Sequence, residues 1–86
     1  MNIVLVDLND GTVITEAMLK QEWKTGREND LENTPRCFEA YLLEVILATI
    51  NGRNDLDIIG VTPRETMEYI EAIREKIRNG NGGKSA

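Results

Sequence analysis

The sequence predicts a small α+β domain, in which an N-terminal β-hairpin is followed by three α-helices and the second helix is central. Three observations carry this prediction. Residues 2–7 are a short run rich in β-branched side chains, three later segments each open with a threonine that suits a helix N-cap, and 86 residues suffice for one domain. We expect that domain to span residues 1–79, with a flexible glycine-rich tail over residues 80–86.

The hairpin is predicted from the turn residues that follow the first strand. Asn9 and Asp10 suit a type I turn, and Gly11 suits the left-handed position that closes it. Residues 12–14 are then the return strand. Both faces of the first strand are apolar, and an isolated two-stranded hairpin is only marginally stable. We therefore expect helices to cover the hairpin, or its sheet to continue across a dimer.

Helices are predicted over residues 16–25, 35–51 and 63–79. Gly26 is expected to end the first helix, because glycine accepts the left-handed conformation of a C-terminal cap. Glu65 lies three residues after a threonine and is expected to complete a capping box at the start of the third helix. The three threonines expected at the N-caps are Thr15, Thr34 and Thr62.

The second predicted helix is apolar around most of its circumference, which is typical of a central helix. One apolar stripe recurs at helical spacing from Phe38 to Thr49, and a second consists of Leu43, Leu47 and Ile50. Because the domain is so small, we expect another subunit to cover one side of this helix. The expected assembly is a homodimer formed through this helix or through the edge of the hairpin.

The residue types that the chain lacks exclude several kinds of chemistry. Histidine is absent, which removes the commonest general base and zinc ligand, and Cys37 is the single cysteine. A lone cysteine suits the reducing cytoplasm and is expected to be a structural thiol in the first turn of the second helix. We expect no catalytic residues, metal or cofactor. No apolar run approaches the length of a membrane-spanning helix, and the N-terminus lacks the pattern of a signal peptide.

The charge of the chain is unevenly distributed. The net charge is −5, and residues 1–60 carry 11 acidic and 5 basic side chains, whereas residues 61–86 carry 4 acidic and 5 basic ones. An acidic chain disfavours direct binding to nucleic acid, because phosphate contacts need lysine and arginine. It favours a partner protein with a basic surface.

The candidate partner-binding residues are acidic side chains in two predicted loops, together with the single tryptophan. The loop carboxylates are either a binding surface for a basic partner or simply solvated charges. Trp23 either packs the first helix onto the hairpin or the second helix, or, if exposed, marks a binding hot spot. The candidates are Trp23, Glu28, Asp30, Glu32, Asp55 and Asp57.

Residues 58–78 offer an alternative function, because a glycine before a capped helix is also found in the helix-turn-helix motif. Counted from Gly60, however, the apolar positions of the third helix fall one residue late. The segment before the glycine reads as a loop, with Ile58 and Ile59 as loop anchors or a short helical turn. The alternative is a nucleic-acid-binding regulator whose contacts would be Arg64, Arg74, Lys76 and Arg78.

Residues 6–46 resemble a known group of proteins, and the resemblance lies in the segments "VDLNDGTVITEAMLKQEW" and "CFEAYLLEVI". In their order of short elements they are similar to small acidic proteins of phages and prophages of Gram-positive bacteria. The resemblance implies a phage accessory protein in the bacterial cytoplasm. Such proteins include inhibitors of host defence, such as anti-CRISPR proteins, which bind a host protein. The expected function is therefore inhibition of a nucleic-acid-handling host protein, with a structural or assembly component of the virion as a further option.

Overall fold

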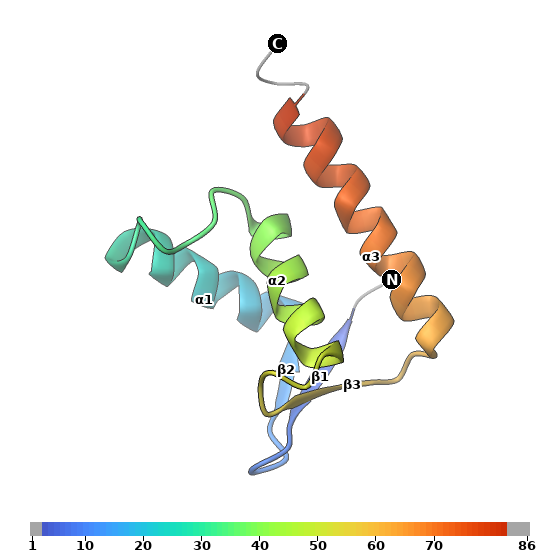
Figure 1. The fold of residues 1–86 in the computed structure, drawn as a ribbon. Coiled ribbons are helices and arrows are strands. Elements are labelled where there is room, and N and C mark those ends of the chain that lie inside the picture. The colour runs from blue at the N-terminus through green and yellow to red at the C-terminus, as the bar shows by residue number, and fades with distance from the viewer. Residues whose placement is uncertain (1–2, 83–86) are drawn as a thin grey trace.

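The computed structural model describes residues 3–82 and confirms the α+β class, with a hairpin at the N-terminus, three α-helices and a central second helix (Figure 1). A π-helical turn, Arg78–Gly82, follows the last helix, and residues 83–86 of the expected tail lie outside the described residues. The strands are β1 (Val4–Asp7), β2 (Val13–Thr15) and β3 (Leu56–Ile59), and the helices are α1 (Glu16–Asn29), α2 (Phe38–Ile50) and α3 (Pro63–Ile77).

The sheet has three strands rather than the two expected from the sequence. Its order is β2-β1-β3 with both neighbours antiparallel, so the N-terminal strand β1 is central. Ile58 and Ile59 were expected as loop anchors or a short helical turn, and that expectation is wrong. They pair with Leu5 and Val4 of β1 instead. Pairing with β3 therefore provides some of the support that the two-stranded hairpin was expected to need.

The outer edge of β3 has its backbone donors already engaged. The register places the N–H groups of Leu56 and Ile58 on the side of β3 that faces away from β1. The Leu56 N–H donates to Oδ1 of Asn54 at 3.2 Å, and the Ile58 N–H donates to Oδ1 of Asp57 at 2.9 Å. Capping of an edge by side chains discourages pairing with another strand. This edge is therefore a poor place for the sheet to continue into a second subunit.

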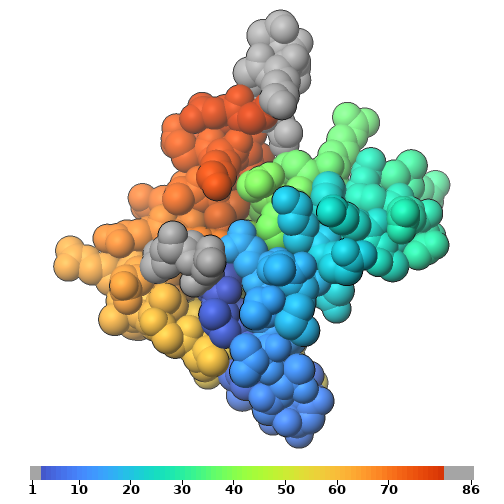
Figure 2. All heavy atoms as spheres, turned by 180° about the vertical axis from the view of Figure 1, so that it is seen from behind, coloured from blue at the N-terminus to red at the C-terminus, as the bar shows by residue number. Residues whose placement is uncertain are grey.

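The core lies between one face of the sheet and the helices, and α2 contributes most to it. Leu5 of β1 is fully buried, and its strand neighbours on that face are Ile14 and Ile58. The other face of the sheet is more open. Val13 and Ile59 are 50% and 38% exposed there, and Figure 2 shows the strands reaching the surface on that side. The buried apolar residues are Ile3, Leu5, Leu19, Phe38, Leu42, Ile46, Ile70 and Ile73.

Two of the three predicted helix caps are confirmed. Oγ1 of Thr15 accepts the N–H of Met18 at 3.3 Å at the start of α1. At α3 the capping box is complete, because Oγ1 of Thr62 accepts the N–H of Glu65 at 3.1 Å and Oε1 of Glu65 accepts the N–H of Thr62 at 2.9 Å. Gly11 also has the positive φ, +76°, that the hairpin turn predicted. Local sequence signals therefore act as expected at these three positions.

The predicted boundary between the first two helices is wrong. Helix α1 continues through Gly26 to Asn29, and Thr34 packs so closely against this glycine that a Cβ at position 26 would lie 2.8 Å from Oγ1 of Thr34. Thr34 does not cap α2, since its hydroxyl donates to the carbonyl of Asp30 at 2.7 Å. Helix α2 begins at Phe38, after the N-cap residue Cys37, which was expected in the first turn.

The connection between α1 and α2 is held by side-chain hydrogen bonds to its backbone. Nε1 of Trp23 donates to the carbonyl of Pro35 at 2.8 Å, and Nη1 of Arg27 donates to the carbonyl of Thr34 at 3.1 Å. These bonds hold Thr34 and Pro35 against α1, although the sequence predicted these two residues as the start of the second helix. Over residues 3–82, no helix is long and apolar enough to cross a membrane.

Candidate acidic groove

A groove of about 830 Å³ opens where the hairpin, α1 and α2 meet. The groove is shallow and open to solvent. Among the residues that the structure describes, its lining includes three carboxylates and no lysine or arginine. We call this the acidic groove. Its acidic residues are Asp7, Asp10 and Glu22, and its large apolar side chains are Ile14, Met18 and Tyr41.

The hairpin turn fixes two of the three carboxylates. The N–H of Asp7 donates to the carbonyl of Thr12 at 2.8 Å, and its own carbonyl accepts the N–H of Gly11 at 2.7 Å. Oδ1 of Asp7 accepts the N–H of Asn9, and Oδ1 of Asp10 accepts the N–H of Thr12 at 2.9 Å. Hydrogen bonds from the Thr12 side chain and backbone hold the pKa of Asp10 below its ordinary value, so this carboxylate stays ionised in mildly acidic solution.

The third carboxylate is coupled to the aromatic wall of the groove. The Tyr41 hydroxyl on α2 donates to Oε2 of Glu22 on α1 at 3.3 Å. Burial, and then the negative charges of Glu22 and Glu44, raise the pKa of Tyr41 above its ordinary value. The phenol is therefore neutral and remains a donor at physiological pH. Its ring lies 6.5 Å from the Phe38 ring, which in turn lies 6.1 Å from the Trp23 ring.

The positive charges of α1 point away from the groove. Successive residues of a helix are about 100° apart, so Lys20 and Lys24 lie almost opposite Glu22 on the helix surface. Nζ of Lys20 lies 5.7 Å from the centroid of the Phe38 ring. Arg27 is engaged with the carbonyl of Thr34, as described above. Helix α1 therefore presents an acidic side to the groove and a basic side to the opposite surface.

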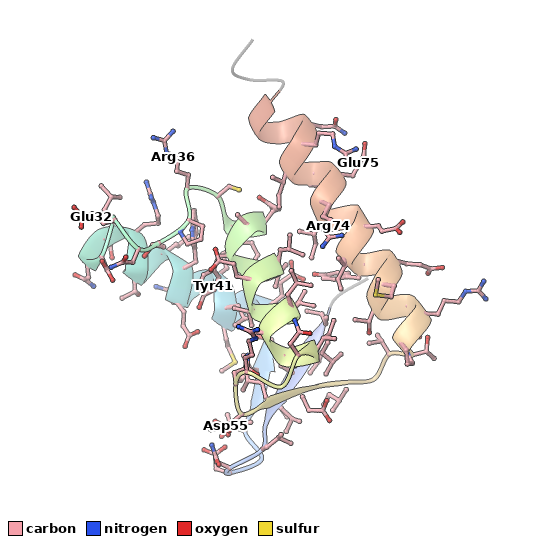
Figure 3. The ribbon with its side chains drawn as sticks, in the orientation of Figure 1. Glu32, Arg36, Tyr41, Asp55, Arg74 and Glu75 are labelled. Carbon is pink, nitrogen blue, oxygen red and sulfur yellow. The ribbon has the colours of Figure 1, made fainter. Side chains whose placement is uncertain are left out.

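The first predicted loop lies away from the groove. Glu28 ends up in the last turn of α1, and Asp30 and Glu32 follow it, all three exposed. Both carboxylate oxygens of Asp30 accept from Nδ2 of Asn33, at 3.0 and 3.2 Å. We call residues 28–32 the distal acidic segment. Figure 3 shows Glu32 at the far end of α1 and Asp55 beside the hairpin turn, so the structure does not bring the two predicted loops together.

The second predicted loop belongs partly to the surroundings of the groove. Oδ2 of Asp55 accepts from Nδ2 of Asn9 at 3.2 Å, which places this carboxylate beside the hairpin turn. Asp55 thus extends the acidic surface around Asp7 and Asp10. Asp57 lies within β3, where its side chain accepts the N–H of Ile58. The Asp57 carboxylate therefore caps a backbone donor at the edge of the sheet.

Trp23 lies at the border of the core rather than on an open surface. The side chain is half-buried, packs edge-on against Phe38 and donates its indole N–H to the carbonyl of Pro35. These contacts match the packing interpretation of this residue. A tryptophan whose N–H is satisfied inside the protein has no polar handle left for a partner.

Sequence reasoning did not select Asp7, Asp10, Glu22 or Tyr41 as site residues. It read Asp10 as a turn residue only and Tyr41 as part of an apolar helix stripe. Asp7 before the turn and Asp10 within its Asp-Gly step were the available signal for the hairpin half of the groove. The helical half gave no signal, because Glu22 and Tyr41 are 19 residues apart and meet only through the packing of α1 on α2.

A smaller hollow of about 360 Å³ lies between the three helices and has mixed charge. The carboxylates of Glu16, Glu39 and Glu68 line it together with Lys76. The Tyr69 hydroxyl donates to Oε2 of Glu16 at 3.0 Å, and burial followed by this bond raises the pKa of Tyr69. Glu16 therefore ties α1 to α3. Within residues 3–82, no group of three or more cysteine or carboxylate side chains is placed to hold a metal ion.

Residues 58–78 do not have the layout of a helix-turn-helix. The strand β3, and not a helix, precedes the turn at Gly60. Of the four expected phosphate contacts, Arg78 forms an ion pair with Glu75 at 2.9 Å. Arg74 and Glu75 of α3 are both exposed, and Figure 3 shows where they lie on the helix. Acidic and basic side chains are mixed along this helix, with Glu65, Glu68 and Glu71 between Arg64 and Arg74.

Comparisons of the chain with protein-family models, with curated proteins and with solved structures found no match. The function must therefore be argued from the acidic groove itself.

Proposed function

We propose that this protein is a non-enzymatic binding protein that docks its acidic groove onto a basic surface of a partner protein. The observation that carries the proposal is the composition of the groove. Three carboxylates surround the apolar side chains of Ile14, Met18 and Tyr41, and no described lining residue is basic. Such a surface attracts cations over a distance and buries apolar atoms on contact.

A partner protein fits this surface better than a nucleic acid or a metal ion does. Nucleic acid carries the same sign of charge as the groove and would be repelled. A small metal ion would gain nothing from the apolar side chains of the groove. A protein segment that carries both a basic and an apolar side chain matches both parts of the lining.

The biological form that we propose is inhibition of a host protein that handles nucleic acid. Such proteins bind phosphates through basic surfaces, and an acidic protein that covers the basic surface would compete with the nucleic acid. The resemblance of residues 6–46 to small acidic phage proteins supports this setting. A phage inhibitor of a host defence factor, as anti-CRISPR proteins are, is the most specific version of the proposal.

The expected homodimer remains a prediction. The β3 edge is capped, so the edge at β2 and α2, where Ile50 of the second stripe is 49% exposed, remain the candidate interfaces. Sedimentation equilibrium at several protein concentrations distinguishes a dimer from a monomer.

Affinity capture from a bacterial lysate tests the proposed function. The immobilised wild-type protein is compared with Glu22→Lys in the groove and with Glu32→Lys in the distal acidic segment, which changes the net charge by the same amount. We expect proteins retained by the wild type and by Glu32→Lys to be lost with Glu22→Lys and to be released by moderate salt. Equal retention by all three proteins, or retention that salt does not weaken, would contradict the proposal.

A further inference from the structure

We propose that the groove is occupied by an arginine side chain of the partner, which stacks on the ring of Tyr41 and is hydrogen-bonded by the surrounding carboxylates. This inference rests on the proposed function and names the residue that anchors the partner. It follows from three features of the groove: an aromatic wall held in place, carboxylates on separate elements, and negative charge that no basic lining residue balances.

The aromatic wall is fixed before any partner arrives. Tyr41 is held through its hydroxyl by Glu22 at 3.3 Å and through its ring by Phe38. The side chain is half-buried, and its remaining surface lines the groove. Guanidinium groups stack on aromatic faces more readily than ammonium groups do, because the guanidinium is planar and less strongly hydrated.

The carboxylates approach the groove from different elements of the fold. Asp7 ends β1 and Asp10 lies in the hairpin turn, whereas Glu22 projects from α1. A guanidinium has five N–H donors in one plane and can bond acceptors on two sides at once. The compact ammonium group of lysine lacks this planar fork. Acceptors that line one groove from the hairpin and from α1, together with an aromatic ring, therefore favour arginine.

The stem of an arginine also finds a suitable surface. Ile14 of β2 is half-buried and Met18 of α1 is 45% exposed, and both line the groove between the hairpin and α1. The methylene groups of arginine pack on apolar side chains while the charged end reaches polar groups. Methionine adapts its shape to such a guest at small cost.

The negative charge of the groove also favours an arginine as its occupant. Glu44 adds a fourth negative charge near Tyr41, and Lys20 and Lys24 lie on the other side of α1. A bound cation therefore reduces the electrostatic repulsion that these carboxylates exert on one another in the free protein. A second copy of this chain could in principle offer Arg74, so self-association is one outcome that the test must detect.

Two short peptides test the inference on the unmodified protein. They are identical, with flanking leucines and lysines, except that the central residue is arginine in one and lysine in the other. Binding is followed by fluorescence anisotropy at low salt, and sedimentation checks that the protein does not self-associate under the same conditions. We expect the arginine peptide to bind at least about threefold more tightly.

Variants at position 41 locate the preference. Tyr41→Phe keeps the ring and is expected to keep the preference for arginine, whereas Tyr41→Leu is expected to abolish it, and circular dichroism confirms that both variants fold. If both peptides bind the wild type equally, the arginine anchor is wrong while the proposed function stands. If neither peptide binds, both proposals fail. Self-association that blocks the groove would replace the partner by a second copy of the chain and would also overturn the inference.

Discussion

The acidic groove and the distal acidic segment each carry three carboxylates, and they differ in what holds them. The groove carboxylates sit on a strand end, a hydrogen-bonded turn and a helix, around apolar side chains. Those of the distal segment lie at and beyond the end of α1, where all are exposed and the Asp30 carboxylate accepts from the neighbouring Asn33 side chain. The groove combines its charge with a hollow that the half-buried side chains of Ile14 and Tyr41 line, whereas residues 28–32 are all exposed. Surface charge without such support contributes little to specific binding.

The largest effect on stability is expected from a substitution that removes core packing beside the acidic groove. Leu5→Ala deletes a fully buried side chain from β1, directly before the groove residues Asp7 and Asp10. We expect it to lower the free energy of unfolding by about 2–5 kcal/mol, because the cavity cannot fully collapse. The matched change Leu31→Ala, in the distal segment, removes a side chain that is 60% exposed and should alter stability by less than about 0.5 kcal/mol.

Urea unfolding followed by the fluorescence of Trp23 measures both variants, since this is the single tryptophan and it contacts the core. Comparable losses for the two leucine variants would show that the groove and the distal segment do not differ in their support.

A charge reversal in each region is expected to have the next largest effect. Glu22→Lys should weaken the arginine peptide about tenfold, because it removes an attraction and adds a repulsion in the groove. Glu32→Lys changes the net charge equally and should weaken the peptide less than about twofold. Titrations at several salt concentrations measure both, and the salt dependence should decrease only for Glu22→Lys. Equal weakening by the two variants would mean that only the total charge matters.

A smaller effect concerns pH. The pKa of Asp10 is lower in the folded protein than its ordinary value, so its ionised form stabilises the folded state. This contribution is present above about pH 4 and is lost as the pH falls through the lowered pKa. Asp10→Asn should therefore be less stable than the wild type at pH 7 and equal to it near pH 2. Urea unfolding at both pH values checks this, with Asp30→Asn as the control, and a difference that persists at pH 2 would rule out the carboxylate as its cause.

The smallest effect is spectroscopic. Burial and the charge of Glu22 raise the pKa of Tyr41, so its titration midpoint should lie above that of an ordinary tyrosine. Glu22→Gln should lower the titration midpoint of Tyr41, whereas Glu32→Gln should leave it unchanged. Absorbance near 295 nm follows the titration, in a Tyr69→Phe background that removes the other tyrosine. No difference between the two glutamine variants would show that Glu22 does not act on Tyr41.

The parts of the fold that the sequence predicted are those with a local cause. The threonine caps Thr15 and Thr62 and the left-handed Gly11 each act within a few residues, and all three were predictable. Strand β3 was not, because its four residues include Asp57, follow a polar segment, and become a strand only by pairing with β1, about fifty residues earlier. The start signal at Thr34 was overridden by contacts with α1.

The site was harder to predict than the fold for a related reason. The sequence shows charge as clusters along the chain, so Glu28, Asp30 and Glu32 stood out. The groove gathers single carboxylates from three elements, and only the packing of α1 and α2 beside the hairpin places them together. Of the predicted residues, only Asp55 lies beside this surface, through its bond to Asn9.

The most direct test of the acidic groove as the binding site is a residue-by-residue map of where a basic peptide binds. The uniformly ¹⁵N-labelled protein is titrated with the arginine peptide, and the change in each backbone amide signal is recorded. We expect the largest changes around Asp7, Asp10, Met18, Glu22 and Tyr41, with residues 28–33 almost unaffected. Changes concentrated in residues 28–33, or along α3, would contradict the assignment of binding to the groove.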